Sequence, residues 1–469
     1  MVFSSLIFLF AYLPVTLLIY YAVGRKWRNL ALFAVSLFFY GWGEPIYLFL
    51  MVASITTAYF FGFFIEKYRY SAPRRAKAAM IWSISINLAF LIFFKYYNFF
   101  ATNLSLLPFV EIPVLKDLEL PIGISFYTFQ IMSYTIDLYR RDCSLQKNYI
   151  SFGTYVTLFP QLIAGPIVRY KDVDEQLSGR HESIELFASG VSRFAVGLAK
   201  KILIGDMLAA GNEYFKATGF YQSTTLGAWM TIILYTLHLY YDFSGYSDMA
   251  IGLGKMFGFR FPENFNYPYI AKSITEFWRR WHISLSTWFR EYVYIPLGGN
   301  RCSAALRYRN MAVVWLLTGF WHGANWNFVL WGLYYLVILI AEKAFLLKAL
   351  ERTPAILRHL YTMVIVTVGF LIFSFIDVGA GWACFTALFG IGVSGFSSSV
   401  VWYQVARTLP LLLIAALGAT PLPSKCFAAM TARFEKTKLF IPILCLLSLI
   451  LCTAYMVDST FSPFAYTQF

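Results

Sequence analysis

Two histidines stand out among the side chains that could do chemistry, and the first is His322. It lies in the middle of the apolar stretch LLTGFWHGANWNFVLWG (316–332), near the amides of Asn325 and Asn327. An ionisable residue in such a stretch is costly to bury in lipid, so a functional role is the first hypothesis. Desolvation keeps an imidazole neutral, and a neutral imidazole has the lone pair that a general base needs. A neutral histidine hydrogen-bonded between packed helices remains an alternative.

The second histidine, His282, lies in EFWRRWHISLSTWFREY (276–292), which we predict to be one amphipathic helix. Large apolar side chains recur there at alternating spacings of three and four residues: Trp278, Trp281, Leu285, Trp288 and Tyr292. We expect this stripe to lie in the acyl boundary of a membrane, with Arg280 on the opposite, wet face. His282 and Ser286 would lie together at the edge of the stripe, beside Arg279. An ordinary interfacial histidine explains the same pattern.

Two carboxylates, Asp242 and Asp248, lie in the aromatic segment YYDFSGYSDM. A carboxylate in these surroundings needs a partner, which could be a histidine, a turn opened by the glycines, or a basic group of residues 255–310. Asp242 could therefore orient an imidazole or cap a broken helix. Asp with Ser-Gly starting two residues later is ordinary turn chemistry, which favours the cap.

Other familiar chemistries lack support in this sequence. The six cysteines form no CxxC pair, and the five histidines form no HExxH motif, so we expect no structural metal. The motif GxSxG and the P-loop are missing as well, which leaves serine hydrolase and kinase functions without a local signal.

The elements that must position these residues are membrane helices. Of the 469 residues, 59% are hydrophobic and 13% charged, and the mean hydropathy is +0.61, values that nearly exclude a soluble enzyme. Apolar runs suited to spans or buried helices cover 5–23, 30–43, 46–65, 80–101, 122–139, 150–167, 186–209, 226–254, 311–330, 331–347, 361–376, 382–395, 404–420 and 439–456. We predict breaks at the prolines of FPQLIAGPI and at the glycines of YDFSGYSDMAIGLGKMFG. The chain is thus expected to be one all-α, polytopic membrane domain, residues 1–469.

The net charge of +14 is explained by short basic clusters between apolar runs, so we expect a membrane topology bias and no nucleic-acid partner. The first run has three basic residues directly after it and none before, which predicts an N-terminus outside the membrane and no signal peptide. The segment 255–310 is weakly apolar and rich in arginine, and we expect it to be cytoplasmic or interfacial.

Several motifs together resemble the membrane-bound O-acyltransferases, and within them a bacterial branch similar to the alginate O-acetyltransferases. The resemblance covers almost the whole chain. It rests on AYLPV (11–15), PIGISFYTFQ (121–130), FPQLIAGPI (159–167), YDFSGYSDMAIGLG (241–254), FWRRWHISLSTWFREYVYIPLGGNR (277–301), WHGANWNF (321–328) and the aromatic tail FAYTQF (464–469).

The resemblance implies a ring of about 11 to 14 membrane helices around a central funnel, in the bacterial inner membrane. The family's catalytic histidine corresponds to His322 and its second functional histidine to His282. The donor in this branch resembles acetyl-CoA on the cytoplasmic side, a co-substrate rather than a bound cofactor, whose phosphates Arg279, Arg280, Arg290 or Arg301 would attract. Partners of such proteins are periplasmic SGNH-type acetyltransferases and the machinery that makes and exports a polysaccharide.

Four alternatives stay open at this point. Within the family, D-alanyl transfer to teichoic acid from a carrier protein is one, and O-acetylation of peptidoglycan, cellulose or another glycan is the second. Broken helices and buried ionisable groups also mark the substrate sites of transporters, although no inverted repeat is visible. A passive scaffold that docks partners through the tail 457–469 is the last.

Overall fold

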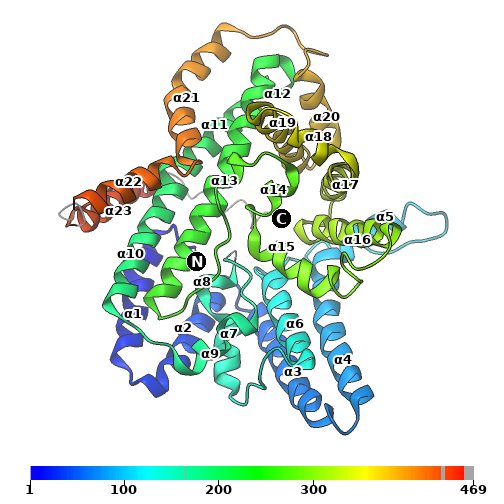
Figure 1. Ribbon diagram of the computed structural model, residues 1–469, viewed down its shortest axis with the longest axis vertical. Helices are drawn as coiled ribbons and strands as arrows, with labels where there is room; N and C mark the ends of the chain where they lie inside the picture. The colour runs from blue at the N-terminus through cyan, green and yellow to red at the C-terminus, as the bar shows by residue number, and fades with distance from the viewer. Residues whose placement is uncertain (1, 164, 435–438, 459–469) are drawn as a thin grey trace. The chain divides into compact units, whose positions relative to one another are not determined.

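The computed structural model describes residues 2–163, 165–434 and 439–458, and these residues form helices without any strand (Figure 1). One isolated bridge within them joins Thr224 to Gly395. The all-α fold class is therefore confirmed. The chain divides into two compact units, Met1–Phe194 with Tyr246–Pro262, and Ala195–Gly245 with Glu263–Phe469. Two of the three borders fall within helices, α10 (Ile184–Ala199) and α13 (Thr225–Met256), and the third, after Pro262, falls in the irregular chain that follows α13.

The first unit begins with a series of helices joined by short turns. Its α-helices are α1 (Leu13–Ala22), α2 (Arg28–Gly43), α3 (Tyr47–Tyr68), α4 (Pro73–Leu91), α5 (Tyr97–Leu104), α6 (Ile124–Arg140), α7 (Tyr149–Thr157), α8 (Phe159–Leu162) and α9 (Tyr170–Gly179). Tighter or wider turns occur at η1 (Phe8–Tyr12), η2 (Arg25–Trp27) and η3 (Ile92–Tyr96). Figure 1 shows α3 and α4 side by side, and they pack against each other along their length.

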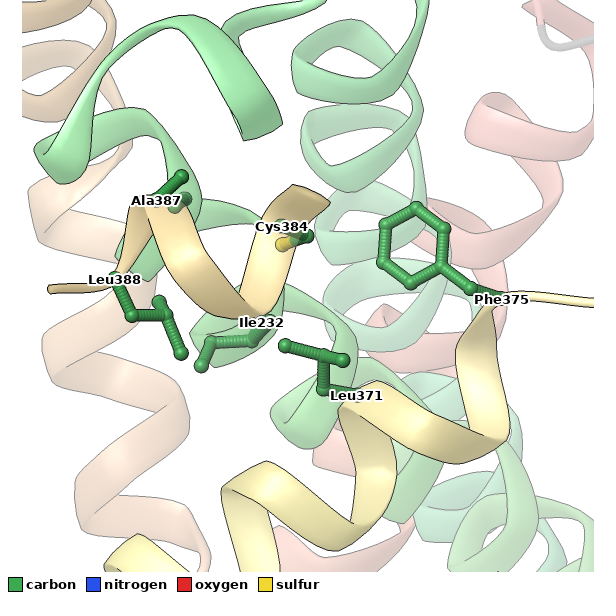
Figure 2. Close-up of a cluster of buried hydrophobic side chains, with 7 residues drawn as sticks. Ile232, Leu371, Phe375, Cys384, Ala387 and Leu388 are labelled. Atoms are coloured by element: carbon green, nitrogen blue, oxygen red, sulfur yellow. The ribbon is translucent and has the colours of Figure 1, made fainter. Parts of the chain in front are cut away.

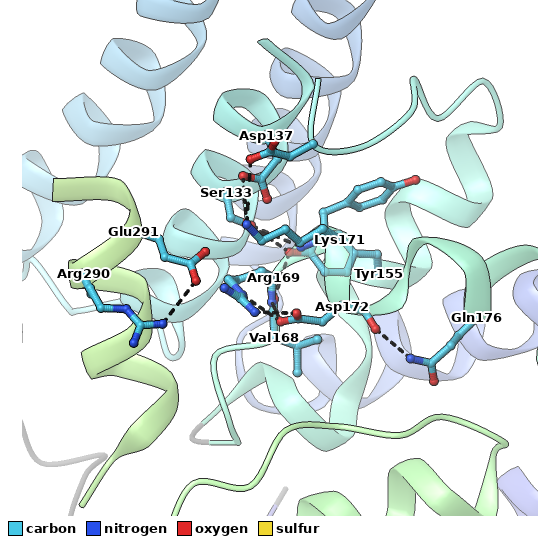
Figure 3. Close-up of polar contacts among 12 residues, drawn as sticks. Ser133, Asp137, Tyr155, Val168, Arg169, Lys171, Asp172, Gln176, Arg290 and Glu291 are labelled. Atoms are coloured by element: carbon cyan, nitrogen blue, oxygen red, sulfur yellow. Dashed lines mark hydrogen bonds and ion pairs between the residues drawn. The ribbon is translucent and has the colours of Figure 1, made fainter. Parts of the chain in front are cut away.

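Aromatic rings fill the centre of the first unit. Phe8, Phe39 and Phe159 are at most 1% exposed, and their ring centroids lie 5.5–6.2 Å apart. Polar groups hold the start of α9, where Arg169 pairs with Asp172 at 2.6 Å (Figure 3). The packing of Phe159 in α8 against Phe8 in η1 and Phe39 in α2 fixes the short, irregular segment around the two prolines.

The second unit contains the remaining helices. They are η4 (Lys200–Gly205), α11 (Asp206–Ala217), α12 (Phe220–Ser223), η5 (Pro268–Ile270), α14 (Ile274–Trp278), α15 (Ile283–Phe289), η6 (Arg290–Tyr294), α16 (Ala304–His322), α17 (Trp326–Ala341), η7 (Glu342–Leu346), α18 (Leu347–Glu351), α19 (Ala355–Ser374), α20 (Val378–Ala387), α21 (Ser399–Gly418), α22 (Leu422–Arg433) and α23 (Phe440–Asp458). Part of its apolar core joins α13, α19 and α20, where Ile232, Leu371 and Cys384 meet (Figure 2). These three side chains are at most 3% exposed.

Within the described residues, six helices are long and apolar enough to cross a membrane: Tyr47–Tyr68, Pro73–Leu104, Trp326–Glu351, Ala355–Ser374, Ser399–Gly418 and Phe440–Asp458. Large apolar side chains lie on their outer faces, as in α23, where Leu446, Leu447 and Ile450 are more than half exposed. Water would not tolerate so much apolar surface, whereas lipid does. The protein is therefore a multi-pass membrane protein. The ring and funnel that the resemblance implies stay a prediction.

One predicted interruption is confirmed and another is wrong. The proline-containing segment is broken as expected, since α7 ends at Thr157 and α8 spans four residues. Three of the four glycines after residue 241, Gly245, Gly252 and Gly254, lie instead inside the continuous 32-residue α13, and the fourth, Gly258, follows its end at Met256. A Cβ atom on Gly245 would come within 2.7 Å of the Gly197 carbonyl oxygen. Glycine here permits close helix packing and does not end the helix.

The predicted run 382–395 is also shorter than expected, because α20 ends at Ala387. Gly390 and Gly392 follow with φ values of 78° and 77°, in the left-handed region that glycine adopts without strain. The predicted tail 457–469 lies outside the described residues from 459 onward.

Candidate active site

His282 breaks the helix that the sequence predicts over 276–292. The helix stops after α14 and restarts as α15, and His282 between them has φ 45° and ψ 54°. The backbone N–H of Ile283 donates to the Asn264 carbonyl at 3.0 Å, so this segment pairs with an extended stretch of chain. Tertiary hydrogen bonding thus replaces the helical pattern that the aromatic spacing indicates.

The aromatic stripe of this segment is buried in protein, which corrects its expected place in the acyl boundary. Trp281 and Trp288 are each 2% exposed, and Tyr292 is 7% exposed. Trp281 stacks on Phe277 with ring centroids 5.6 Å apart. The same large apolar side chains can face lipid or a protein core, and composition does not distinguish the two environments.

The His282 side chain is oriented by a neighbouring amide. Its Nδ1 donates to Asn264 Oδ1 at 3.2 Å, and the same oxygen accepts hydrogen bonds from the Ser284 N–H and hydroxyl at 3.2 and 2.8 Å. With the oxygen fixed as acceptor, the proton is assigned to Nδ1 and the lone pair to Nε2. His282 is 1% exposed, and this burial lowers its pKa to about 3. The imidazole is therefore neutral at physiological pH.

A cavity of about 290 Å³ opens beside His282, entirely within the second unit. Its walls are largely apolar or aromatic, with Trp278, Trp315 and Phe289 among them. Ser286 also lines it, so the predicted grouping of His282, Ser286 and Arg279 is observed. An apolar cavity with a few convergent polar groups is the usual form of a small-molecule site.

Three cations line the same cavity: Arg279, Arg290 and Lys343. All three are exposed to solvent, so they can accept an anionic group at the entrance. Arg280 is not among the lining residues and pairs instead with Glu276 at 2.9 Å. The sequence therefore identified two of the three cations, and Lys343 was missed because it lies inside the predicted apolar run 331–347, outside the basic segment 255–310.

Two π-helical turns carry part of this lining. Arg290 and Tyr294 belong to η6, and Lys343 belongs to η7. A π-helical turn holds one residue more than an α-helical turn, which re-aims the side chains on it; η7 lies between α17 and α18, and η6 ends the helical segment that begins with α15. Such turns are frequent at functional sites.

Glu342, also in η7, holds the start of α14 in place. It is 1% exposed and accepts hydrogen bonds from the N–H groups of Ile274 and Thr275 at 2.7 and 2.8 Å. The Thr275 hydroxyl and the Tyr361 hydroxyl donate to it at 2.6 and 3.2 Å. A buried carboxylate at a helix N-terminus stabilises the unpaired N–H groups there. Glu342 therefore positions the short helix whose far end leads to Arg279 and His282.

Replacing Glu342 by glutamine is expected to raise the KM for the donor about five- to tenfold with little change in kcat, because neutral hydrogen bonds hold α14 less firmly. Steady-state kinetics on purified protein would measure this. Glu351→Gln is the matched control, since Glu351 is exposed near the end of the same helical segment. A fall in kcat at unchanged KM would contradict the positioning role.

His322 is the last residue of α16, and it is 4% exposed. The chain turns at Gly323, which is extended, and α17 begins at Trp326. The predicted boundary between the runs 311–330 and 331–347 is therefore wrong by several residues. His322 lies at a helix end between two helices and not in the middle of a span. Helix ends are placed by local turn geometry, which apolar composition does not reveal.

Aromatic rings surround His322 and connect it with His282. Its imidazole packs edge to face against Trp331 and Phe373, with centroids 5.0 and 5.3 Å away. The Trp321 ring lies 5.1 Å from His322 and 5.8 Å from His282. The structure thus brings both predicted histidines into contact with one indole ring. His322 is not among the described residues that line the cavity.

Small residues let α16 and α17 approach closely around His322. A Cβ on Gly319 would come within 2.5 Å of the Phe328 carbonyl oxygen, and one on Gly323 within 2.2 Å of the Phe328 ring. Any side chain at these positions would force the helices apart. The glycines of the WHGANW region therefore serve to hold the histidine between two tightly packed helices.

The other predicted site residues lie elsewhere. Asp242 is in the middle of α13, so the predicted cap is wrong; its Oδ1 lies 2.6 Å from Lys201 Nζ. Lys201 also contacts Asp206 at 2.6 Å. Asp248 belongs to the first unit, where it pairs with Arg193 at 2.7 Å. Asn325 is exposed at the start of α17.

The sequence analysis missed Asn264, Glu342 and Lys201. The last two lie in or at the end of apolar runs, and a charged residue in such a run is itself a signal of a buried partner. Asn264 gave no comparable signal, because its role depends on a contact with a residue 18 positions later.

Comparison with known proteins decides the family. The family model described as MBOAT, membrane-bound O-acyltransferase family, matches residues 144–384, more than half of the chain, and it includes both histidines. The chain belongs to the membrane-bound O-acyltransferase family. The matched region extends through parts of both units and contains the whole His282 cavity.

Individual relatives support the assignment to the membrane-bound O-acyltransferase family. A probable alginate O-acetylase of Pseudomonas aeruginosa is 45% identical over 84% of this chain and 75% of its own length. That of Pseudomonas putida is 39% identical over the full length of both. The peptidoglycan O-acetyltransferase of Helicobacter pylori is 36% identical over 82% of this chain and 77% of its own length. The protein is thus a membrane acyltransferase of the O-acetyltransferase type, which decides against the transporter and scaffold hypotheses.

Proposed function

We propose that this protein transfers the acetyl group of acetyl-CoA across the bacterial inner membrane for O-acetylation of an exported polysaccharide, alginate. The observation that carries the donor assignment is the cavity beside His282, with apolar walls and three cations. Acetyl-CoA combines these chemistries, because its acetyl and pantetheine parts suit apolar walls and its phosphates suit cations. The acceptor assignment rests on the names of the alginate O-acetylases that this chain resembles.

On the donor side, Arg279, Arg290 and Lys343 would bind the phosphates at the cavity entrance. His282 would meet the thioester deeper in the cavity. Its Nδ1 is engaged by Asn264, so the ring would face the donor with its Nε2 edge. Apolar walls exclude water, which protects the thioester from hydrolysis.

In the transfer step, His322 would remove the proton of an acceptor hydroxyl while the hydroxyl oxygen attacks the thioester carbonyl. The new C–O ester bond forms, the C–S bond breaks, and the proton passes to the departing CoA sulfur. Buried aromatic neighbours keep the imidazole neutral and therefore able to accept that proton. The thioester is already activated, so alignment of the two reactants supplies much of the catalysis.

The proposed topology places the N-terminus outside and the donor cavity toward the cytoplasm. The basic clusters between the apolar runs support this orientation. Acetyl groups would leave on the periplasmic side, where an SGNH-type acetyltransferase and the polysaccharide export machinery would receive them.

Membrane vesicles supplied with radiolabelled acetyl-CoA and alginate test the proposal. We expect label in alginate, and release of free CoA, in vesicles that contain the protein together with its partner acetyltransferase. Label that requires an acylated carrier protein would point instead to D-alanyl-type transfer. Label in peptidoglycan but not in alginate would overturn the acceptor assignment.

Cavity variants test the donor site. Arg279→Gln and Lys343→Gln are each expected to raise the KM for acetyl-CoA about tenfold, the effect of losing one charge-assisted hydrogen bond. Arg301→Gln is the matched control, because Arg301 is exposed in the same basic segment but does not line the cavity. An equal rise in all three variants would indicate general attraction to positive charge and would contradict the assigned site.

A further inference from the structure

Another cavity, with polar walls, lies in the first unit, and none of the elements of the candidate active site lines it. It has a volume of about 310 Å³ and lies where the link between α1 and α2 meets the link between α9 and α10. Charged and ionisable side chains on its walls come from both links: Arg25, Lys26, Arg28, Arg180, His181 and Glu182. We call this cavity the basic pocket.

The single carboxylate of the basic pocket is already neutralised. Glu182 pairs with Arg28 at 2.6 Å and with Arg180 at 3.8 Å. Burial opposes its ionisation, but hydrogen bonds from Tyr20 and Arg28 hold the pKa of Glu182 below its usual range. The excess positive charge of the pocket is therefore available to a ligand.

Two of the cations, Arg25 and Lys26, are exposed. Their side chains form no ion pair with any acidic group in the part of the chain that the structure describes. Long cationic side chains next to one another repel, so an anion between them is stabilising. These two residues can close over an anion that enters the pocket.

Arg180 is fixed before any ligand binds. Its Nε donates to the Tyr20 hydroxyl at 2.9 Å and its Nη1 to Asn29 Oδ1 at 2.6 Å. Its side chain is 6% exposed, yet Nη2 has no hydrogen-bond partner among the described residues. A buried guanidinium that is held on two sides and has an unused donor fits an oxyanion, and a phosphate above all.

The surroundings of the basic pocket are those of a membrane surface. Leu18 in α1 is 71% exposed and Trp27, just before α2, is 57% exposed. Tryptophan next to apolar helix ends typically lies at the level of lipid headgroups. The first turn of α2 also begins beside the pocket without an acidic residue, which favours an anion there.

We propose that the basic pocket binds the phosphate group of an anionic phospholipid. The excess of cations supplies the charge, Arg180 supplies a fixed donor, and the exposed apolar side chains of α1 accommodate the acyl chains. The site is independent of the acetyl donor.

Native mass spectrometry of the purified protein, titrated with phosphatidylglycerol, tests the proposal. Arg25→Gln combined with Lys26→Gln is expected to weaken binding about tenfold or more, since each cation near a lipid surface adds to the attraction for an anionic headgroup. The matched control is Arg74→Gln with Lys77→Gln, which removes the same charge from exposed positions at the start of α4. Equal weakening in both variants, or none in the first, would overturn the site.

Two further measurements identify the source of the phosphate. Phosphatidylcholine with the same acyl chains and inorganic phosphate at equal ionic strength should each bind at least tenfold more weakly than phosphatidylglycerol. Inorganic phosphate that competes as well as the lipid would overturn the lipid assignment. The KM for acetyl-CoA should stay unchanged in the Arg25/Lys26 variant; a rise would mean that the pocket holds the donor's phosphates and that the proposal is wrong.

Discussion

Replacing His322 by alanine is expected to lower acetyl transfer by about 10² to 10⁴-fold, the range that a positioned general base contributes. The reason is that His322 lies in a buried site packed by aromatic rings, where its imidazole is the group assigned to take the proton of the acceptor. Release of CoA from acetyl-CoA, measured in reconstituted vesicles, gives the rate. Thermal unfolding of the same preparation should show a folded protein.

The control for this prediction is His359→Gln, which replaces another half-buried histidine of the second unit, one whose Nδ1 donates to the Ala271 carbonyl oxygen at 3.3 Å. Its transfer rate should remain within about twofold of the unaltered protein. Similar losses in both variants would mean that general destabilisation explains the effect, and the catalytic role would be refuted.

A fast-quench experiment separates two roles of His322. If the imidazole carries the acetyl group itself, radiolabelled acetyl-CoA without acceptor should leave acid-quenched label on His322. If it acts as a base, label should never accumulate on the protein. Either outcome is compatible with the loss of rate in His322→Ala, so the labelling result decides between them.

Lys201→Met is expected to be the most destabilising substitution, by about 3–5 kcal/mol, because it removes the cation from a buried cluster with two carboxylates. Lys201 is 2% exposed, and its Nζ lies 2.6 Å from both Asp206 and Asp242. Without it, Asp242 would be an uncompensated charge in a fully buried position. Fluorescence-detected unfolding in detergent should show a much lower midpoint temperature.

A compensating substitution makes the Lys201 prediction specific. Lys201→Met with Asp242→Asn should recover most of the lost stability, because a neutral amide is far less costly to bury than a carboxylate. Lys147→Met is the control for loss of a lysine, since Lys147 is exposed. Failure of the double variant to recover would show that the ion pair is not the source of the stability.

The sequence predicted the class of fold and singled out the two histidines as candidate functional residues. Both conclusions depend on features that composition and short motifs record. Hydrophobic runs specify membrane helices, and a histidine in such a run is rare enough to attract attention. The grouping of Arg279, His282 and Ser286 followed from their proximity in the chain. All three line one cavity, even though the predicted helix is broken there.

What the sequence could not predict are partners that are distant along the chain. The broken helix at His282 depends on Asn264, and the position of α14 depends on Glu342, 68 residues beyond Ile274. Likewise, the glycines of α13 favour close helix packing over a break, a distinction that requires the neighbouring helix. Lys201 and Asp242, which are 41 positions apart in the chain, meet through the same kind of long-range contact.

The π-helical turns η6 and η7 have a consequence for how this family tolerates insertions and deletions. Each holds one residue more than an α-helical turn would, so deleting one residue from η7 (Glu342–Leu346), which has α17 before it and α18 after it, would convert the turn into regular helix. Every side chain after the deletion would then rotate by about 100° about the helix axis relative to those before it. A one-residue gap at this place in a relative's sequence would therefore change the cavity lining. We expect such a relative to differ in its donor site, and we do not expect the gap to be neutral length variation.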